Sequence, residues 1–263
     1  MYRCRSCGTA FVHPTPSDEE LTRFYNRYHL SDDAGGQYDA VEARMQADFP
    51  SKVALVMAAT GKAPGKLLDV GCGKGFFVKA CRDAGIDAHG VDLSASGVQY
   101  ASEVLGVPAT AGLIGELGAT LGQFDTATFW ATIEHLPDPI GTLRDIHSVL
   151  KPGGRLLLDT GIGHDWLDRN LPGLTQWYNP PEHLFVFSGD GLRVALEKAG
   201  FVIERHDRSF ERSGLRRFVK GARNMVLTLG LKVAAGAGRL KTGGFTMTRY
   251  PVGNLQSVVA RKA

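Results

Sequence analysis

The sequence predicts an α/β fold built on a mostly parallel sheet, and three observations support this prediction. Apolar runs of strand length alternate with segments of helical length between Lys66 and Gly161. Glycine is abundant, with 33 residues, which suits a fold with many tight turns between strands and helices. A hydrophobic content of 43% over 263 residues is enough for one sizeable core. Strands separated by helices of this length imply parallel pairing with right-handed crossovers.

The expected elements follow one another along the chain in a regular order. Ser17 and Glu20 form a capping-box pattern, so we expect a helix to begin there, and a second helix from about Ala40 to Ala59. Ser94 has the spacing of an N-cap for the helix that follows it. From residue 66 on we expect strands at 66–71, 87–94, 107–112, 124–132, 155–161, 201–209 and 253–263, and helices at 75–85, 95–106, 139–154 and 188–200.

The charge of the chain is distributed unevenly. The net charge is +3, and no acidic residue follows Glu211. Residues 212–263 carry eleven basic residues, so the net charge of residues 1–211 is 3 − 11 = −8. A block this one-sided suggests an anionic partner, substrate or surface. The eleven are Arg212, Arg216, Arg217, Lys220, Arg223, Lys232, Arg239, Lys241, Arg249, Arg261 and Lys262.

Residues 209–248, which include most of these basic residues, are expected to form an insert with an apolar stripe at helical spacing. Three interpretations of the insert stay open. The stripe packs on the body of the domain, lies on an anionic membrane surface, or forms a lid that recruits a phosphorylated or lipid-linked substrate. The apolar run within the insert is too short, and too often interrupted by Lys232, to span a bilayer. No nucleic-acid partner is expected, because no stacking motif accompanies the charge. The stripe consists of Leu215, Phe218, Val219, Ala222, Val226 and Leu229.

The N-terminal residues 1–16 resemble half of a zinc ribbon, because Cys4 and Cys7 form a C-x-x-C-G knuckle. A structural zinc site needs four ligands, and His13 is the one conceivable addition, so we expect no metal. We expect three units in sequence: this partial ribbon, a helical cap at 17–60 and a main domain at 61–263. The N-terminus has no apolar signal core and the cysteines form no disulfide framework, so a cytoplasmic location is expected.

The stretch "LLDVGCGKGFF" indicates a nucleotide site of a particular kind. A nicotinamide fingerprint needs a third glycine where this chain has Phe76, and Asp69 would repel a pyrophosphate at the mouth of the turn. Asp92 ends the next strand, where a carboxylate can accept hydrogen bonds from both ribose hydroxyls. The pocket therefore favours a ribose joined to positive charge, which describes S-adenosylmethionine better than NAD.

Four motifs in order resemble the class I S-adenosylmethionine-dependent methyltransferases, in their small-molecule group of quinone, sugar and natural-product enzymes. They are "LLDVGCGKG", "VDLS", "FDTATFWATIEHLPDP" and "LKPGGRLLLDT", which together cover about Lys66 to Thr160, and the later "PPEHLFVFSGDGLRVALEKAGF" is similar to the same group. The resemblance implies a Rossmann-like seven-stranded sheet of order 3-2-1-4-5-7-6 with the last strand antiparallel and an N-terminal helical cap. It also implies methyl transfer to a small molecule, sugar or lipid-linked intermediate, most readily at oxygen, with S-adenosylhomocysteine as product.

The resemblance also assigns the cofactor residues one by one. Gly71 and Gly73 approach the methionine part by their backbone, with Cys72 between them and Asp69 near the ammonium group. Asp92 takes the ribose. Leu93, Gly112 and Leu113 line the adenine, for which Glu116 is the nearest acidic residue, and Trp130 and Ala131 close the methionine side.

Two histidines are candidate general bases, since a base is needed when the acceptor is a hydroxyl. His135 and His183 follow the expected strands, in loops that should face the ligand crevice. Each histidine could instead only order its own loop. The aromatic residues Tyr25, Tyr28, Trp177 and Tyr178, together with Trp166, are candidate substrate contacts, or else ordinary packing residues. A non-catalytic S-adenosylmethionine-binding regulator that acts through its basic tail is the alternative function.

Overall fold

The computed structural model describes residues 1–17, 19–21, 32–61, 63–165, 168–169, 177–178, 180, 182–208 and 255–263, with the backbone alone over 32–45. The predicted insert at 209–248, Tyr25, Tyr28 and Trp166 lie outside these residues. Of the eleven basic residues after Glu211, the structure describes Arg261 and Lys262, both in the last strand. Lys262 Nζ donates to the carbonyls of His147 and Leu150, so its charge is used within the domain.

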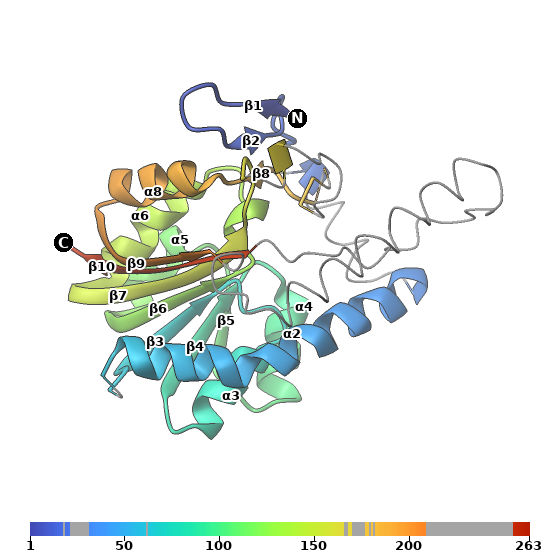
Figure 1. Ribbon diagram of the computed structural model, residues 1–263. Helices are drawn as coiled ribbons and strands as arrows, with labels where there is room; N and C mark the ends of the chain where they lie inside the picture. The colour runs from blue at the N-terminus through green and yellow to red at the C-terminus, as the bar shows by residue number, and fades with distance from the viewer. Residues whose placement is uncertain are drawn as a thin grey trace, which may run out of the picture.

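A seven-stranded sheet forms the centre of the molecule, with strand order β5-β4-β3-β6-β7-β10-β9 (Figure 1). Counted along the chain from β3, this is the predicted order 3-2-1-4-5-7-6. The pairs from β5 to β7 are parallel, and β10 is antiparallel to both β7 and β9, so the predicted fold class is confirmed. The strands are β3 (Lys66–Val70), β4 (Asp87–Asp92), β5 (Ala109–Ala111), β6 (Phe124–Trp130), β7 (Leu150–Gly161), β9 (Phe201–Arg208) and β10 (Leu255–Lys262).

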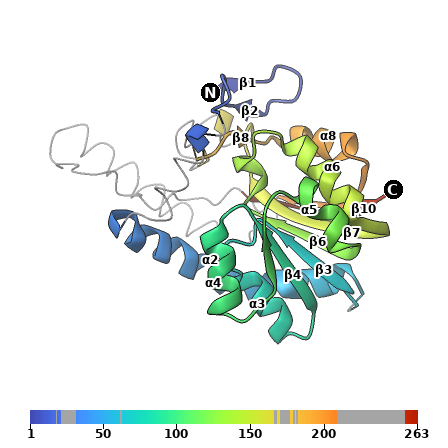
Figure 2. The ribbon, with the colours of Figure 1, turned by 180° about the vertical axis from the view of Figure 1, so that it is seen from behind.

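Helices cover both faces of this sheet (Figures 1 and 2). On one face, Phe77 and Val78 of α3 join Val56 of α2 and Leu67 of β3 in a buried cluster. On the other face, Ile146 of α6 belongs to a second buried cluster with residues of β6 and α8. The first layer contains α2 (Asp32–Ala59), α3 (Phe76–Asp83) and α4 (Ala95–Glu103), and the second contains α5 (Ile114–Leu121), α6 (Pro139–Val149) and α8 (Gly189–Lys198).

A second, small sheet joins the N-terminus to a late part of the chain. Strands β1 (Tyr2–Arg3) and β2 (Ala10–Phe11) form a hairpin, and β2 pairs with β8 (Phe185–Val186), all antiparallel. The N-terminal hairpin therefore lies beside β8 at one end of the molecule (Figure 2). None of the helices that the structure describes combines the length and the apolar character that crossing a bilayer requires.

The predicted helix starts are confirmed at the level of individual hydrogen bonds. Ser17 N–H donates to Glu20 Oε2 at 2.8 Å, and Glu20 N–H donates to Ser17 Oγ at 3.3 Å, which is the reciprocal capping box. Ser94 Oγ accepts from Gly97 N–H at 3.1 Å and caps α4. These caps depend on residues three apart, so local sequence is sufficient to predict them.

Two boundaries and one helix differ from the expectation. Helix α6 ends at Val149 and β7 begins at Leu150, because Leu150 already pairs with Phe124 and Pro152 disfavours a helical residue before it. Helix α5 was not expected, because its N-cap Leu113 offers no capping side chain. Helix α2 begins at Asp32, eight residues before the predicted start.

Candidate active site

The turn between β3 and α3 brings three glycines into the left-handed region. Their φ angles are 75° at Gly71, 53° at Gly73 and 79° at Gly75, conformations that residues with a Cβ atom rarely adopt. A Cβ on Gly71 would also collide with the side chain of Thr132, which follows β6. The turn therefore keeps its backbone accessible and packs it directly against the segment that carries His135.

Asp92, at the end of β4, binds this turn from the neighbouring strand. Its Oδ2 accepts from Gly73 N–H at 2.7 Å, and its Oδ1 accepts from Ser94 N–H at 2.8 Å. A carboxylate has about four acceptor positions, so both oxygens can still accept from ribose hydroxyls. The two backbone bonds hold the carboxylate at the crevice before any ligand arrives.

Two leucines at adjacent strand ends present apolar surface to solvent. Leu93 is 64% exposed and Leu113 is 48% exposed, each directly beyond a strand of the buried sheet. Their strands are neighbours, and Gly112 N–H donates to the carbonyl of Asp92 at 2.9 Å. Leu93 and Leu113 together offer apolar surface against which a flat aromatic base can pack.

Asp69 lies in β3, two residues before Gly71, and is 3% exposed. Thr128 Oγ1 donates to its Oδ1 at 2.7 Å, yet burial dominates and raises the pKa of Asp69 to about 7. A cation placed beside this carboxyl group would favour its ionised form. The Cys72 thiol packs on Gly90 and donates to the Gly73 carbonyl at 3.7 Å, and burial raises its pKa, so it stays a neutral thiol within the turn.

The end of β6 is held in a strained conformation by a carboxylate of β7. Ala131 has φ 47°, in the left-handed region, and its N–H donates to Asp159 Oδ1 at 2.9 Å. Lys52 of α2 completes the arrangement, with Nζ 3.0 Å from Asp159 Oδ2 and 4.6 Å from the centroid of the Trp130 ring. The Trp130 indole packs edge to face on Phe77 in the core, so the backbone of this residue faces the crevice.

The structure brings His135 and His183 together. Their ring centroids are 4.9 Å apart in an edge-to-face arrangement. His135 ends a short 3-10 helix, η1 (Ile133–His135), directly after β6, and its Nδ1 lies 2.7 Å from the carbonyl of Glu182. His183 Nδ1 lies 2.9 Å from the carbonyl of Trp177. Since a carbonyl can only accept, His183 carries its proton on Nδ1, and Nε2 is its basic nitrogen. The His135 ring interacts with two carbonyls, those of Glu182 and Ala131.

Burial sets the protonation of this pair and of its acidic neighbour. It lowers the pKa of both histidines, and the charge of His135 adds to the effect on His183, so both rings are neutral near pH 7. Glu134 is 3% exposed, and burial raises the pKa of its carboxyl group. Its Oε2 accepts from Thr160 Oγ1 at 2.8 Å, which fixes the carboxyl group beside the two rings.

Glu134, His135 and His183 also form the one group of three possible metal ligands among the described residues. One donor atom from each lies within 4.8 Å of the others, and imidazole with carboxylate suits zinc, iron or manganese. Cys4 and Cys7 form a knuckle in which Gly8 N–H donates to the Cys4 carbonyl at 2.9 Å, and backbone N–H groups lower the pKa of Cys4. Across the described ranges no third ligand joins these two thiols.

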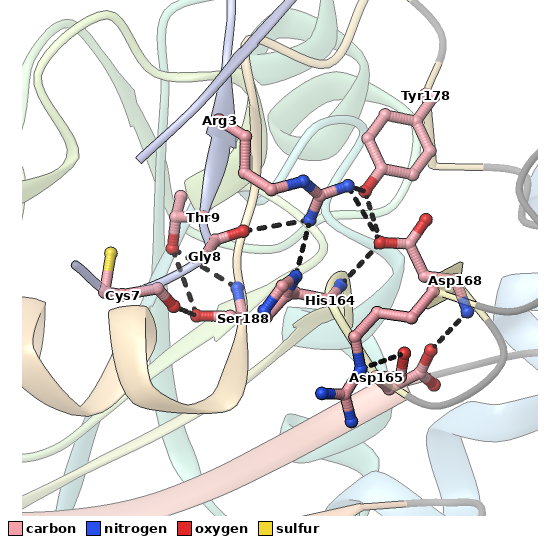
Figure 3. A network of polar contacts seen from close by, with 10 residues as sticks. Arg3, Cys7, Gly8, Thr9, His164, Asp165, Asp168, Tyr178 and Ser188 are labelled. Atoms are coloured by element: carbon pink, nitrogen blue, oxygen red, sulfur yellow. Dashed lines mark hydrogen bonds and ion pairs between the residues drawn. The ribbon is translucent and has the colours of Figure 1, made fainter. Parts of the chain in front are cut away.

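The two predicted substrate aromatics that the structure describes lie beside the histidine pair. The Trp177 ring is 5.7 Å from the His183 ring, and its Nε1 is buried without an acceptor among the described residues. Tyr178 turns its hydroxyl away, into a polar network with Arg3 and Asp168 (Figure 3).

Sequence reasoning missed Lys52, Asp159 and Arg3. Asp159 carried a usable signal, since it is an acidic residue near the end of a buried parallel strand. Lys52 and Arg3 carried none, because each depends on where a distant segment lies against the sheet.

Comparisons with known proteins agree with this geometry. Residues 41–206 match the family model described as a methyltransferase domain. The ubiquinone biosynthesis O-methyltransferase of Methylococcus capsulatus is 29% identical over 153 residues, covering 54% of this chain and 60% of that protein. The enzyme of the same name from Xanthomonas axonopodis pv. citri is 29% identical over 189 residues, covering 63% of this chain and 74% of that protein.

Solved structures show the same fold at low sequence identity. Magnesium protoporphyrin IX methyltransferase from Synechocystis PCC 6803, with bound S-adenosylhomocysteine, has a TM-score of 0.55 and 20% identity, covering 94% of this chain and 95% of that chain. A possible histamine N-methyltransferase from Thermotoga maritima has a TM-score of 0.56 and 19% identity, covering 92% of this chain and 98% of that chain. These neighbours support the fold.

The family model covers well over half of the chain, and the strand order matches the expectation drawn from the sequence. The prediction of the family and of its cofactor, S-adenosylmethionine, is thereby confirmed. The chain belongs to the methyltransferase domain family.

Proposed function

We propose that this protein transfers the methyl group of S-adenosylmethionine to an oxygen atom of a small-molecule acceptor. The observation that carries the proposal is the pair of neutral imidazoles, His135 and His183, at the carboxyl edge of the sheet. A hydroxyl acceptor must lose a proton during transfer, and a positioned neutral imidazole can accept it. The relatives named as O-methyltransferases support the same acceptor atom.

The cofactor contacts proposed here follow the geometry of the crevice. Asp92 accepts from the ribose hydroxyls, Leu93 and Leu113 flank the adenine on either side of Gly112, and Asp69 lies near the ammonium group. The remaining contacts come from backbone at Gly71, Cys72, Gly73, Trp130 and Ala131.

When bound, S-adenosylmethionine supplies a methyl group already activated by its sulfonium. The chain's own contribution is to align the acceptor and to take one proton. We assign His183 Nε2 as the base, because its ring is oriented by the Trp177 carbonyl and flanked by His135. His135 packs against the same ring, and Trp177, which also contacts it, is the proposed substrate contact. Tyr178, the other aromatic residue predicted there, turns its hydroxyl to Arg3 and Asp168 instead. Alignment supplies most of the rate enhancement, since the methyl group needs no further activation.

The acceptor is proposed to be a phenol or another small hydroxyl compound, either free or linked to a sugar or lipid. The nine basic residues from Arg212 to Arg249 support contact with an anionic membrane surface. Flotation of the full chain with vesicles of anionic lipid at low salt tests this contact. If the chain does not float with the vesicles, the membrane contact is refuted and the proposed acceptor is a freely diffusing compound.

Turnover tests the proposed function directly. The purified chain is incubated with S-adenosylmethionine and a panel of catechols, phenols and sugar-linked hydroxyl compounds, and S-adenosylhomocysteine is measured. Product that depends on one acceptor, with the added methyl group on its oxygen, is the expected result. Tight cofactor binding with no product from any acceptor would instead indicate a non-catalytic S-adenosylmethionine-binding protein.

A further inference from the structure

The N-terminal hairpin carries an arginine whose guanidinium joins three distant segments. Arg3 donates to the Gly8 carbonyl at 3.0 Å, to His164 Nδ1 at 3.2 Å, to Asp168 Oδ2 at 3.0 Å and to the Tyr178 hydroxyl at 2.9 Å (Figure 3). The Asp168 side chain is only 2% exposed, so its charge needs a partner within the protein. Arg3 is the cation that the structure provides for it.

The same carboxylate oxygen gathers further donors around Arg3. Tyr178 Oη donates to Asp168 Oδ2 at 2.8 Å, and His164 N–H donates to it at 2.7 Å. His164 has φ 58°, a left-handed conformation that a histidine keeps only where its surroundings hold it. Arg3 therefore completes a network that fixes both the strained His164 and the Tyr178 side chain.

Tyr178 is one residue from the carbonyl that orients the proposed base. The Trp177 carbonyl lies 2.9 Å from His183 Nδ1, and the Trp177 ring packs against the His183 ring. Holding the Tyr178 side chain therefore also holds the peptide that sets the tautomer and the direction of His183.

The hairpin holds the other side of His183 through the backbone. The Leu184 carbonyl accepts from Val12 N–H at 2.8 Å, and Leu184 N–H donates to the Glu134 carbonyl at 2.8 Å. Strand β2 then pairs with β8 immediately after this point. His183 is thus framed by two anchors, at Tyr178 and at Leu184, and N-terminal residues supply a contact to each.

We propose that Arg3 is a positioning residue of the active site, which acts through Tyr178 and Trp177 to hold His183 in its productive orientation. The inference rests on the proposed role of His183 as base. It gives the N-terminal hairpin a part in the reaction, although the hairpin belongs to none of the cofactor motifs. A displacement of about 1 Å at a reacting group can cost up to about a hundredfold in rate, so a remote anchor can have a large effect.

The test compares Arg3→Gln and Arg3→Lys with Arg82→Gln. Arg82 is a matched control, because its side chain is 40% exposed, against 39% for Arg3, and pairs with Asp87 away from the crevice. Each variant is measured for its melting temperature, for S-adenosylmethionine affinity by calorimetry and for kcat and KM with the best acceptor of the panel. The nitrogen NMR shifts of the His183 ring, recorded at one fixed pH, report whether Nδ1 alone still carries the proton. Asp168→Asn removes the charge of the same network from its other side.

For Arg3→Gln we expect an S-adenosylmethionine affinity within about twofold of the parent and a kcat at least about tenfold lower. For Arg3→Lys we expect a kcat between those of the parent and of Arg3→Gln, because an ammonium group cannot reproduce the forked contacts of a guanidinium group. The nitrogen shifts of His183 should move away from those of a ring protonated on Nδ1 alone, because the Trp177 carbonyl no longer fixes the tautomer, and Asp168→Asn should move them in the same direction. Arg82→Gln should change none of these quantities.

Unchanged nitrogen shifts of His183 and an unchanged kcat in Arg3→Gln would overturn the inference. Loss of cofactor binding together with a collapsed melting temperature would overturn it as well, because Arg3 would then stabilise the whole fold. If no acceptor turns over, the proposed function fails, but the tautomer of His183 still decides whether Arg3 positions this ring. The two failures are therefore distinguishable.

Discussion

Lys52 and Asp159 form an ion pair that joins the long helix α2 to the end of β7, with Nζ 3.0 Å from Oδ2. Both side chains are largely buried, with 15% and 13% exposed. The other oxygen of Asp159 holds the strained Ala131 at the end of β6. The helical cap is therefore tied electrostatically to the crevice through Lys52.

Replacement of Lys52 by Met should destabilise the protein. The change leaves Asp159 without its cation, and we expect the free energy of unfolding to fall by about 2 kcal/mol, as for a mostly buried pair that loses one partner. Urea denaturation measures this quantity. The double variant Lys52→Met with Asp159→Asn should recover part of the loss, because the uncompensated charge is gone while Ala131 N–H keeps an acceptor.

The control for Lys52 is Lys79→Met, whose pair with Asp83 is exposed and spans i,i+4 of α3. It should cost no more than about 0.5 kcal/mol. Equal effects of the two single variants, or a double variant no more stable than Lys52→Met, would contradict the assignment of Asp159 as the dependent charge.

Asp69 should make cofactor binding dependent on pH. Its pKa is raised to about 7 by burial, and an ammonium group beside it would favour the ionised form. Below pH 7 the Asp69 carboxyl group is mostly protonated and must lose its proton when the cofactor binds. The affinity for S-adenosylmethionine should therefore rise with pH, by about tenfold between pH 5.5 and 7. Calorimetry with S-adenosylmethionine at these pH values measures the slope, and Asp69→Asn should flatten it. The same slope in parent and variant would place the ammonium group elsewhere.

Asp92 should dominate the affinity for the nucleoside. Its carboxylate is already fixed by Gly73 and Ser94, so it accepts ribose hydroxyls without reorganisation. Charged hydrogen bonds contribute about 1.5–3 kcal/mol each, so Asp92→Ala should weaken S-adenosylmethionine binding by at least about thirtyfold. Asp87→Ala, which removes an exposed carboxylate from the start of the same strand, is the control. Unchanged affinity in Asp92→Ala would refute the ribose assignment.

The cofactor side of the molecule was predictable because its signals are local. Asp92 ends an apolar strand, Ser94 caps the next helix two residues later, and the glycines of the turn adopt the positive φ angles that only glycine accepts readily. Each of these features is decided within a few residues of sequence. The order of the strands followed from the resemblance of four such motifs.

The acceptor side was less predictable because it is assembled from distant segments. His135 and His183 were expected at the same edge of the sheet, but the sequence contained no signal for the β2–β8 pairing that frames His183. Lys52, Asp159 and Arg3 depend on contacts across 107 and 165 residues, which periodicity and capping rules do not reach. Long-range packing decides these contacts.

The last prediction concerns the base itself. His183→Gln keeps a donor for the Trp177 carbonyl but cannot take a proton, so kcat should fall by about a hundredfold or more while S-adenosylmethionine affinity stays the same. In the parent enzyme, burial lowers the pKa of His183, so the neutral ring persists below pH 6.5 and kcat/KM should decline only at more acid pH. His135→Gln should reduce the rate less, since His135 shapes the pocket.

His147→Gln provides the matched control. His147 lies in the last turn of α6 and packs on Phe201, and burial lowers its pKa as it does for His183. Its kcat should equal that of the parent. Retained activity in His183→Gln would remove this residue as the base. Activity that EDTA abolishes and zinc or manganese restores would assign Glu134, His135 and His183 to a metal ion instead, since a proton acceptor needs no ion to act. Rates measured with and without chelator therefore separate a base from a set of metal ligands.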